Sequence, residues 1–362
     1  MDNEIGVSKF RNINGVTCYM NSILTILQQI PIFTDFIVSG EFKEFLEGED
    51  FSNKIIFQLH KLFRISLSMN NANLTPSTLR KVCTDKDYVW GEHQQQDSAE
   101  FLQFLITKME EELAQNVKFM PGALVGKEQD LLKSIELVQA ISSYQTFTKK
   151  EYSPLKKFFT GLEQTKTQCR ICGNLKSNFQ TFLIWQLPIP IEKTEPNKTF
   201  ELSDCINKWM ETENLDDENR ITCDFCGLKS NINKSYSLFE PPKILVIQLK
   251  RFMKDMYGNV SKKINSKVNF PINDLDIGDY ISSSSCHKSK SKYNLIGVNI
   301  HQELGSLSNI NLGHYVSIVK NRLNSNWYLF NDEVNPIKIT ELKELVNDKS
   351  YLLFYYRVDH DE

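Results

Sequence analysis

Two Cys-x-x-Cys pairs constrain the fold of this chain more than any other feature of the sequence. The segments 169–173 (Cys-Arg-Ile-Cys-Gly) and 223–227 (Cys-Asp-Phe-Cys-Gly) have the spacing of zinc knuckles, and each ends on a glycine that lets the backbone turn around the sulfurs. The intervening segment is longer than that of a compact zinc ribbon, so we expect the pairs to close the tips of two hairpins that meet in space. The alternatives are a redox-active pair or pairs that hold no metal. The predicted ligands of one structural zinc are Cys169, Cys172, Cys223 and Cys226.

A further cysteine, Cys18, stands where a helical pattern begins. Apolar side chains recur at helical spacing from Met20 to Ile30, and Pro31 ends this amphipathic pattern. Thr17 can cap the first turn of the helix. The positive end of a helix favours thiolate, so we expect a lowered pKa for Cys18. The alternative is that Cys18 is simply a small buried apolar side chain.

His314 is the candidate general base. It begins a strand-like run, and the next such run, 327–330, is followed directly by Asn331 and Asp332. An amide or carboxylate there can accept the imidazole N–H and aim the ring at a thiol. His301, which precedes a loop, is the rival base. The three parts of an activated cysteine hydrolase are therefore present, far apart in the sequence.

Six motifs in these regions resemble those of the ubiquitin-specific protease (USP) family, in the family's order. They are the cysteine segment 15–22, the Gln-Gln-Asp-Ser-Ala-Glu-Phe segment 95–101, the segment 241–252 with Leu-Lys-Arg-Phe, the Gly-His-Tyr segment 313–315, the segment 327–332 and the closing strand 351–356. The resemblance therefore covers essentially the whole chain.

The resemblance implies an α+β fold of the papain-like cysteine protease class, with a helical thumb, a β-rich palm and antiparallel β fingers tipped by zinc. We expect one catalytic domain over residues 1–362. Its expected parts are a thumb over 1–145 carrying Cys18, fingers over 160–240 carrying the cysteine pairs, and a palm over 146–159 and 241–357 carrying His314 and Asn331.

The implied reaction is hydrolysis of the isopeptide or peptide bond after the C-terminal glycine of ubiquitin. Cys18 is the expected nucleophile, His314 the acid and base, and Asn331 is favoured over Asp332 as the orienting group because it is the first residue after the strand. No catalytic cofactor is expected. The alternatives are a protease for another ubiquitin-like modifier and a catalytically dead ubiquitin-binding scaffold.

The resemblance also suggests residues that hold the ubiquitin tail, namely Gln96, Asp97, Glu100 and Tyr315. Asp97 and Glu100 have capping-box spacing, so Asp97 could cap the helix that follows as well as bind the tail. Gln96 could equally be structural.

One position departs from the family pattern. The family usually has an asparagine five residues before the nucleophile as an oxyanion donor, and this chain has Ile13 there, between Asn12 and Asn14. In an extended segment, side chains alternate, so both asparagines are expected to face away from the site. We therefore expect the Cys18 N–H and a water near Asp332 to hold the oxyanion, in an enzyme that is slow or depends on an activating partner.

Composition fits a globular protein, and the resemblance implies that its partners are ubiquitin and ubiquitinated proteins. The net charge of −3 gives no reason to expect nucleic acid binding, and no apolar run has the length of a membrane span. The N-terminus lacks a signal-peptide core. Eight cysteines used as thiols and metal ligands indicate the cytosol or nucleus.

The remaining patterns predict a few further elements. We expect helices over 51–69, 98–115 and 127–141, a strand that ends in 186–190, a central strand over 244–249 and a flexible loop at 282–285, with Cys83, Cys205 and Cys286 as ordinary buried or loop residues.

Overall fold

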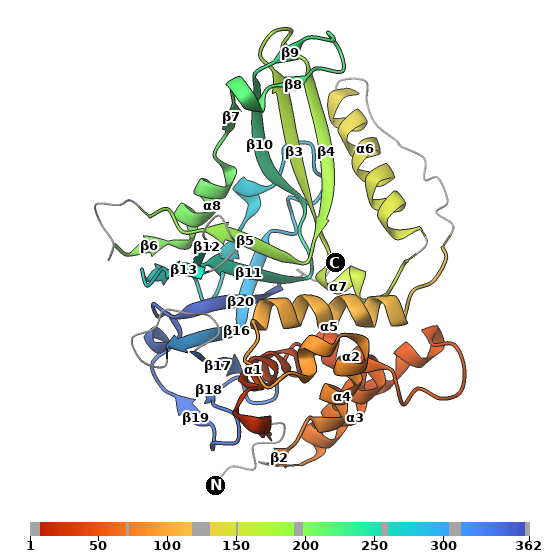
Figure 1. The fold of residues 1–362 in the computed structure, drawn as a ribbon, viewed down its shortest axis with the longest axis vertical. Helices are drawn as coiled ribbons and strands as arrows, with labels where there is room; N and C mark the ends of the chain where they lie inside the picture. The colour runs from red at the N-terminus through yellow and green to blue at the C-terminus, as the bar shows by residue number, and fades with distance from the viewer. Residues whose placement is uncertain are drawn as a thin grey trace.

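The structure is a computed structural model that describes residues 8–69, 72–117, 131–149, 151–191, 198–254, 260–303 and 313–358. Figure 1 shows three parts: a group of N-terminal helices, a large sheet beside it, and a narrow sheet that projects away from both. These match the thumb, palm and fingers expected from the sequence. The first residues of the expected helix 127–141 lie outside the described residues.

The thumb consists mainly of helices from the N-terminal part of the chain. They are α1 (Cys18–Leu27), α2 (Pro31–Ser39), α3 (Ile55–Ser68), α4 (Ser77–Lys86) and α5 (Ser98–Glu112). Pro31 ends α1 as predicted and also occupies the first turn of α2, where its missing N–H costs nothing. All ten residues of α1 are buried, so the helix is covered on every side. Its polar residues Asn21, Ser22 and Thr25 form hydrogen bonds inside the protein.

The palm is an eight-stranded mixed sheet. Its order is β19-β18-β17-β16-β20-β11-β5, with β15 pairing to β16. Its strands are β5 (Ile184–Pro188), β11 (Ile244–Lys250), β15 (Leu275–Asp276), β16 (Lys292–Glu303), β17 (Gly313–Lys320), β18 (Trp327–Phe330), β19 (Ile337–Ile339) and β20 (Ser350–Arg357). β11 is central, between β20 and β5, as predicted from its apolar faces.

The fingers are an antiparallel sheet of order β4-β3-β10-β7. Its strands are β3 (Gly161–Cys169), β4 (Leu175–Phe182), β7 (Glu213–Leu215) and β10 (Ile232–Glu240), with the hairpin β8 (Ile221–Thr222) and β9 (Lys229–Ser230) at its far end (Figure 1). Helix α6 (Leu131–Thr148) packs along β4, and its Glu136 pairs with Lys166 of β3 at 3.0 Å. Two boundaries therefore differ from expectation: α6 lies on the fingers although most of it was assigned to the thumb, and β5 belongs to the palm.

Short elements connect these parts. They are α7 (Lys156–Phe159), α8 (Leu202–Met210), and the strand pairs β1 (Lys9–Phe10) with β2 (Asn73–Leu74), β6 (Phe200–Glu201) with β14 (Val268–Asn269), and β12 (Phe252–Lys254) with β13 (Val260–Lys263). The predicted flexible loop at 282–285 is wrong in part, since Ser282 and Ser284 are buried and their hydroxyls lie 2.9 Å apart. Cys83 and Cys205 are buried and Cys286 is exposed.

The thumb meets the palm where α1 lies on β16 and β17. The approach is close: a Cβ at Gly297 of β16 would stand 2.9 Å from Cγ2 of Ile26 in α1. Glycine at this position therefore fixes the depth at which α1 rests on the sheet. Among the described residues, no single helix has the length and apolarity to cross a membrane; α1 and α2 pass that test only as a pair bent by 92°.

Candidate active site

The candidate catalytic residues meet where three elements begin or end. Cys18 is the first residue of α1, His314 the second residue of β17, and Asn331 and Asp332 directly follow β18. β17 pairs with β18 and packs under α1, so the fold brings together residues that are far apart in the sequence.

The imidazole of His314 is oriented by the residues after β18. Its Nε2 lies 2.6 Å from Oδ1 of Asn331, and 3.7 Å from Oδ2 of Asp332. Asn331 therefore accepts the Nε2 proton, and Nδ1 is the ring nitrogen left for a nucleophile. The shorter of these two distances favours Asn331 over Asp332 as the residue that orients the imidazole.

Asp332 is held in place by two asparagines. Nδ2 of Asn21 donates to Oδ1 at 2.7 Å, and Nδ2 of Asn12 donates to Oδ2 at 2.8 Å. Burial raises the pKa of the Asp332 carboxyl, whereas the bond from Asn21 and the nearby His314 oppose that rise. Its backbone has a positive φ of 47°, which its position at the strand end imposes.

The thiol of Cys18 is fully buried. It accepts a hydrogen bond from the backbone N–H of Tyr315, next to His314, and in the described part of the chain no hydrogen bond joins the thiol to the imidazole. Burial, and to a smaller extent the charge of Asp332, raises the pKa of Cys18 to about 11. The expected lowering at the helix start is therefore wrong for this resting conformation, because desolvation outweighs the helix dipole.

The segment before Cys18 also differs from expectation. Residues Ile13–Gly15 form a 3-10 turn and Asn14 has φ 55°, so side chains do not alternate as in a strand. Oδ1 of Asn12 accepts from the N–H of Thr17 at 2.8 Å while its Nδ2 bonds to Asp332. The amide of Asn12 therefore faces the site, and the expectation that it points away is wrong.

Thr17 and Asn14 also take other roles. The Thr17 hydroxyl accepts from the N–H of Ile13 at 2.8 Å and does not cap α1. Asn14 is exposed and its amide lies 3.4 Å from Nδ1 of His93.

Asp97 caps α5. One carboxylate oxygen accepts from the amides of Ala99 at 2.6 Å and Glu100 at 3.1 Å, and the other accepts from the Tyr351 hydroxyl at 2.7 Å. Burial raises the pKa of Asp97 against these bonds. The capping role is thus present, and the side chain is 9% exposed.

The other suggested tail-binding residues lie at different depths. Gln96 is half-buried, Glu100 is exposed, and the Tyr315 side chain is 2% exposed, so Tyr315 reaches the site through its backbone. Gln95 was not among the expected site residues, and its Oε1 accepts from the N–H of Gly313 at 3.0 Å. The sequence signal for Gln95 was its position next to Gln96 in the motif at 95–101.

His301, the rival base, packs among aromatic rings. It is buried on β16, with its ring 4.7 Å from that of Tyr315 and 5.4 Å from that of Phe252. A Cβ at Gly313 would stand 1.9 Å from its Nε2. The ring of His301 therefore packs under the start of β17, and only glycine fits above it.

The two cysteine pairs meet at the far end of the fingers (Figure 1). Their four sulfurs lie within 4.8 Å of one another, with Cys172 and Cys223 3.8 Å apart. Zinc–sulfur bonds of about 2.3 Å in a tetrahedron give sulfur separations of about 3.8 Å. Both knuckle glycines have positive φ and donate back to the first cysteine of their pair at 2.9 Å. The cluster therefore fits a structural zinc.

Comparison with known proteins agrees with this geometry. The chain is 29% identical over 354 residues to Ubiquitin carboxyl-terminal hydrolase Usp2 of Drosophila melanogaster, covering 97% of this chain and 35% of that protein. It is 27% identical over 364 residues to Ubiquitin carboxyl-terminal hydrolase 2 of Homo sapiens, covering 97% and 55%. The chain thus spans about a third to about half of these relatives.

Solved structures share the fold. The SAGA DUB module of Ubp8, Sgf11, Sus1 and Sgf73 bound to monoubiquitin superposes with a TM-score of 0.73 at 22% identity, covering 100% of this chain and 71% of that one. A second structure, of the yeast SAGA module, also has a TM-score of 0.73, at 23% identity, and covers 100% and 70%. The family description "Ubiquitin carboxyl-terminal hydrolase" matches residues 9–355. Since this match takes in the whole thumb, palm and fingers, the chain belongs to the ubiquitin carboxyl-terminal hydrolase family.

Proposed function

We propose that this protein is a deubiquitinase that hydrolyses the bond after the C-terminal glycine of ubiquitin, using Cys18, His314 and Asn331. The observation that carries the proposal is the 2.6 Å hydrogen bond between His314 and Asn331. His314 is followed on the same strand by Tyr315, whose backbone N–H bonds to the Cys18 thiol. The names of the relatives, and the ubiquitin bound to the structural neighbour, support the choice of substrate.

In the proposed reaction, Nδ1 of His314 takes the Cys18 proton and the thiolate attacks the glycine carbonyl carbon. As the carbon–nitrogen bond breaks, the imidazolium gives that proton to the leaving lysine amine and a thioester remains. His314 then removes a proton from water, hydroxide attacks the thioester, and the thiolate leaves and is reprotonated. Because the resting thiol has a pKa of about 11, its activation requires the imidazole to approach it.

The oxyanion of each tetrahedral intermediate needs hydrogen-bond donors. We propose Asn12 as the side-chain donor, because the 3-10 turn after it places its amide beside Asp332 and Thr17. The Cys18 N–H would be a second donor. This proposal supersedes the expectation of a missing donor.

The cysteine cluster is proposed to hold one structural zinc that supports the fingers, with no role in bond cleavage. Gln96 and Glu100 are proposed contacts of the ubiquitin tail because their side chains are accessible. The cytosol or nucleus is the proposed location, supported by eight cysteines that are all free of disulfides.

Labelling with ubiquitin that carries a C-terminal electrophile tests the function. We expect one stable adduct, absent in Cys18→Ala, and much reduced in His314→Ala with Asn331→Ala intermediate. Failure of Cys18 to react would support a dead scaffold. Preferential labelling by a probe built from a related modifier would instead support the alternative substrate.

A further inference from the structure

The far end of the palm contains a basic pocket that the proposed chemistry does not use. Its volume is about 570 Å³, and we define it by its four cationic lining residues, Lys243, Lys320, Arg322 and Arg357. The lining itself contains no carboxylate, although Asp35, which is not a lining residue, pairs with Arg322 at 2.6 Å. A concave site with one sign of charge concentrates oppositely charged ligands.

The basic pocket is remote from the candidate active site but built on the same elements. Lys320 ends the strand that His314 nearly begins, so roughly 20 Å separates them at about 3.3 Å per residue. Gln29, just beyond the end of α1, also lines the pocket, whereas Cys18 begins that helix. The pocket is thus separate from the channel expected for the ubiquitin tail.

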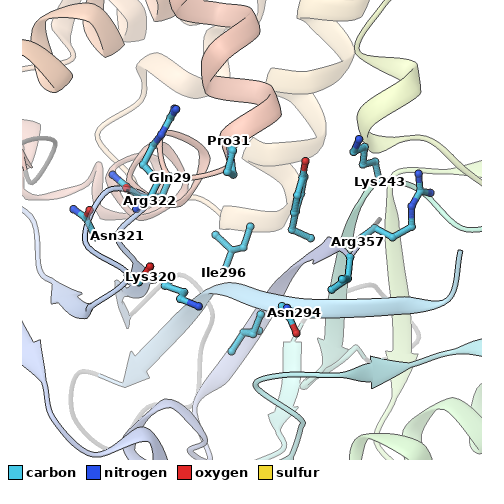
Figure 2. A pocket seen from close by; sticks show the side chains of 13 residues that line it. Gln29, Pro31, Lys243, Asn294, Ile296, Lys320, Asn321, Arg322 and Arg357 are labelled. Carbon is cyan, nitrogen blue, oxygen red and sulfur yellow. Dashed lines mark hydrogen bonds between the residues drawn. The ribbon is translucent and has the colours of Figure 1, made fainter. Parts of the chain in front are cut away.

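The cations fall into two groups around an apolar centre. Figure 2 shows Lys320 and Arg322 on one side of Ile296, and Lys243 and Arg357 on the other. The accessible apolar residues of the lining include Pro31, Ile296 and Val358. A ligand that satisfies both sides must carry two separated negative groups joined by an apolar part.

Two side chains show how the first group could bind. Arg322 pairs with Asp35 at 2.6 Å, and that partner is 66% exposed, so the guanidinium already holds a carboxylate at the pocket and has further N–H donors. Lys320 is half-buried and forms no ion pair with any described carboxylate. Its charge is therefore available to an incoming acid.

We propose that the basic pocket binds an acidic peptide segment of a partner protein, with a carboxylate at each group of cations and an apolar side chain over Ile296. The volume greatly exceeds that of a single phosphate. The concave shape disfavours a flat lipid surface. This inference does not depend on the proposed catalytic activity.

Fluorescence polarisation of the full-length chain with a labelled Glu-Asp-Leu-Asp-Glu peptide tests the proposal. We expect saturable binding that weakens with salt, and no comparable binding of Gln-Asn-Leu-Asn-Gln. Lys320→Glu should weaken binding at least about fivefold, since it replaces an attraction with a repulsion. Lys320→Gln should weaken it less, and it provides a milder variant if charge reversal disturbs folding.

Lys250→Glu is the matched control, because it makes the same charge change at an exposed site at the opposite end of β11 from Lys243. It should leave affinity within about twofold. Equal loss in Lys250→Glu and Lys320→Glu, or no loss in either Lys320 variant, would overturn the proposal.

Two further measurements distinguish other anions. Inorganic phosphate that binds as tightly as the peptide, and loses affinity in Lys320→Glu, would show a small-anion site. Lys320-dependent binding to phosphatidylserine vesicles, without peptide binding, would show a membrane contact. Either result would replace the acidic peptide as the ligand.

Discussion

Asn12, Asn21 and Gln95 each use a side-chain amide to hold another part of the candidate active site. The amides of Asn12 and Asn21 donate hydrogen bonds to the Asp332 carboxylate. Gln95 accepts a hydrogen bond from the backbone N–H of Gly313, just before His314. Amides suit this work because they form several directed hydrogen bonds without introducing charge. Positioning at the residue scale therefore relies on neutral amides, two of which hold the carboxylate of Asp332.

Asn12→Ala should lower kcat by about 10²–10³ if its amide is an oxyanion donor, with little change in KM. Asn14→Ala is the matched control, because Asn14 is exposed and bonds only toward His93, so it should leave kcat within about twofold. Steady-state hydrolysis of a fluorogenic ubiquitin substrate measures both. A large loss in Asn14→Ala with none in Asn12→Ala would refute this assignment.

The raised pKa of Cys18 predicts a pH dependence for the resting thiol. Below a pKa of about 11 the neutral thiol dominates, so the rate of alkylation by iodoacetamide should rise with each step in pH toward that value. The Cys18→Ala variant supplies the background from the other cysteines. A Cys18 rate that is already maximal near neutral pH would show a resting thiolate–imidazolium pair and contradict the raised pKa.

At the scale of elements, glycine positions decide how closely parts approach. Gly297 lets α1 rest on β16, and the glycines that follow the two cysteine pairs let the knuckles turn. A side chain at position 297 would collide with Ile26. L-residues in place of Gly173 and Gly227 would be strained by the positive φ of these positions. These positions fix where Cys18 and the four-cysteine cluster lie.

Gly297→Ala should destabilise the fold by about 1–3 kcal/mol, because its methyl group would meet Ile26. Ile26→Ala alone should cost about 2–5 kcal/mol through a cavity. In the double variant the added methyl partly fills that space, so the combined loss should be smaller than the sum. Chemical denaturation measures all three, and strict additivity would show that this contact does not set the depth of α1.

The cysteine cluster predicts about one zinc per purified chain by elemental analysis. Cys223→Ser should release the metal, lower the melting temperature and weaken ubiquitin binding, because metal binding and folding of the fingers are coupled. Cys286→Ser is the control, since Cys286 is exposed and outside the cluster. Metal-free protein with unchanged melting would refute a structural zinc.

At the scale of the whole molecule, a short polar chain joins thumb to palm inside the core. Oδ1 of Asn299 on β16 accepts from the Ser98 hydroxyl at 2.9 Å, and its Nδ2 donates to the Ser22 hydroxyl at 2.8 Å. These residues belong to α5, β16 and α1, and all three are buried. Buried polar groups satisfied across three elements favour one relative arrangement of them.

Asn299→Ala should destabilise the protein by about 1–3 kcal/mol, because it removes two buried hydrogen bonds and the acceptor of the Ser98 hydroxyl, whereas the Ser22 hydroxyl still donates to the Tyr19 carbonyl. Asn294→Ala on the same strand is the control, since its bond to the N–H of Asp274 is exposed and its loss should cost less. Denaturant midpoints compare them. Equal losses would mean that the polar chain does not hold thumb and palm together.

The sequence by itself identified the candidate catalytic residues and the candidate metal ligands. Cys18, His314 and Asn331 could be named because catalytic function restricts residue type and local context, and the cysteine pairs because knuckle spacing is local. Helices α1, α3 and α5 and the strand β11 were predicted for the same reason, since apolar periodicity and proline act over a few residues, whereas α2 and α4 were not predicted.

Only the tertiary structure decided what depends on neighbours that are distant in the sequence. The pKa of Cys18 is raised because the palm buries the thiol, and Asn12 turns toward Asp332 because a 3-10 turn meets the end of β18. The basic pocket forms because the ends of β16, β17 and β20 converge on one end of α1. Desolvation and convergence arise from packing, and no local pattern encodes them.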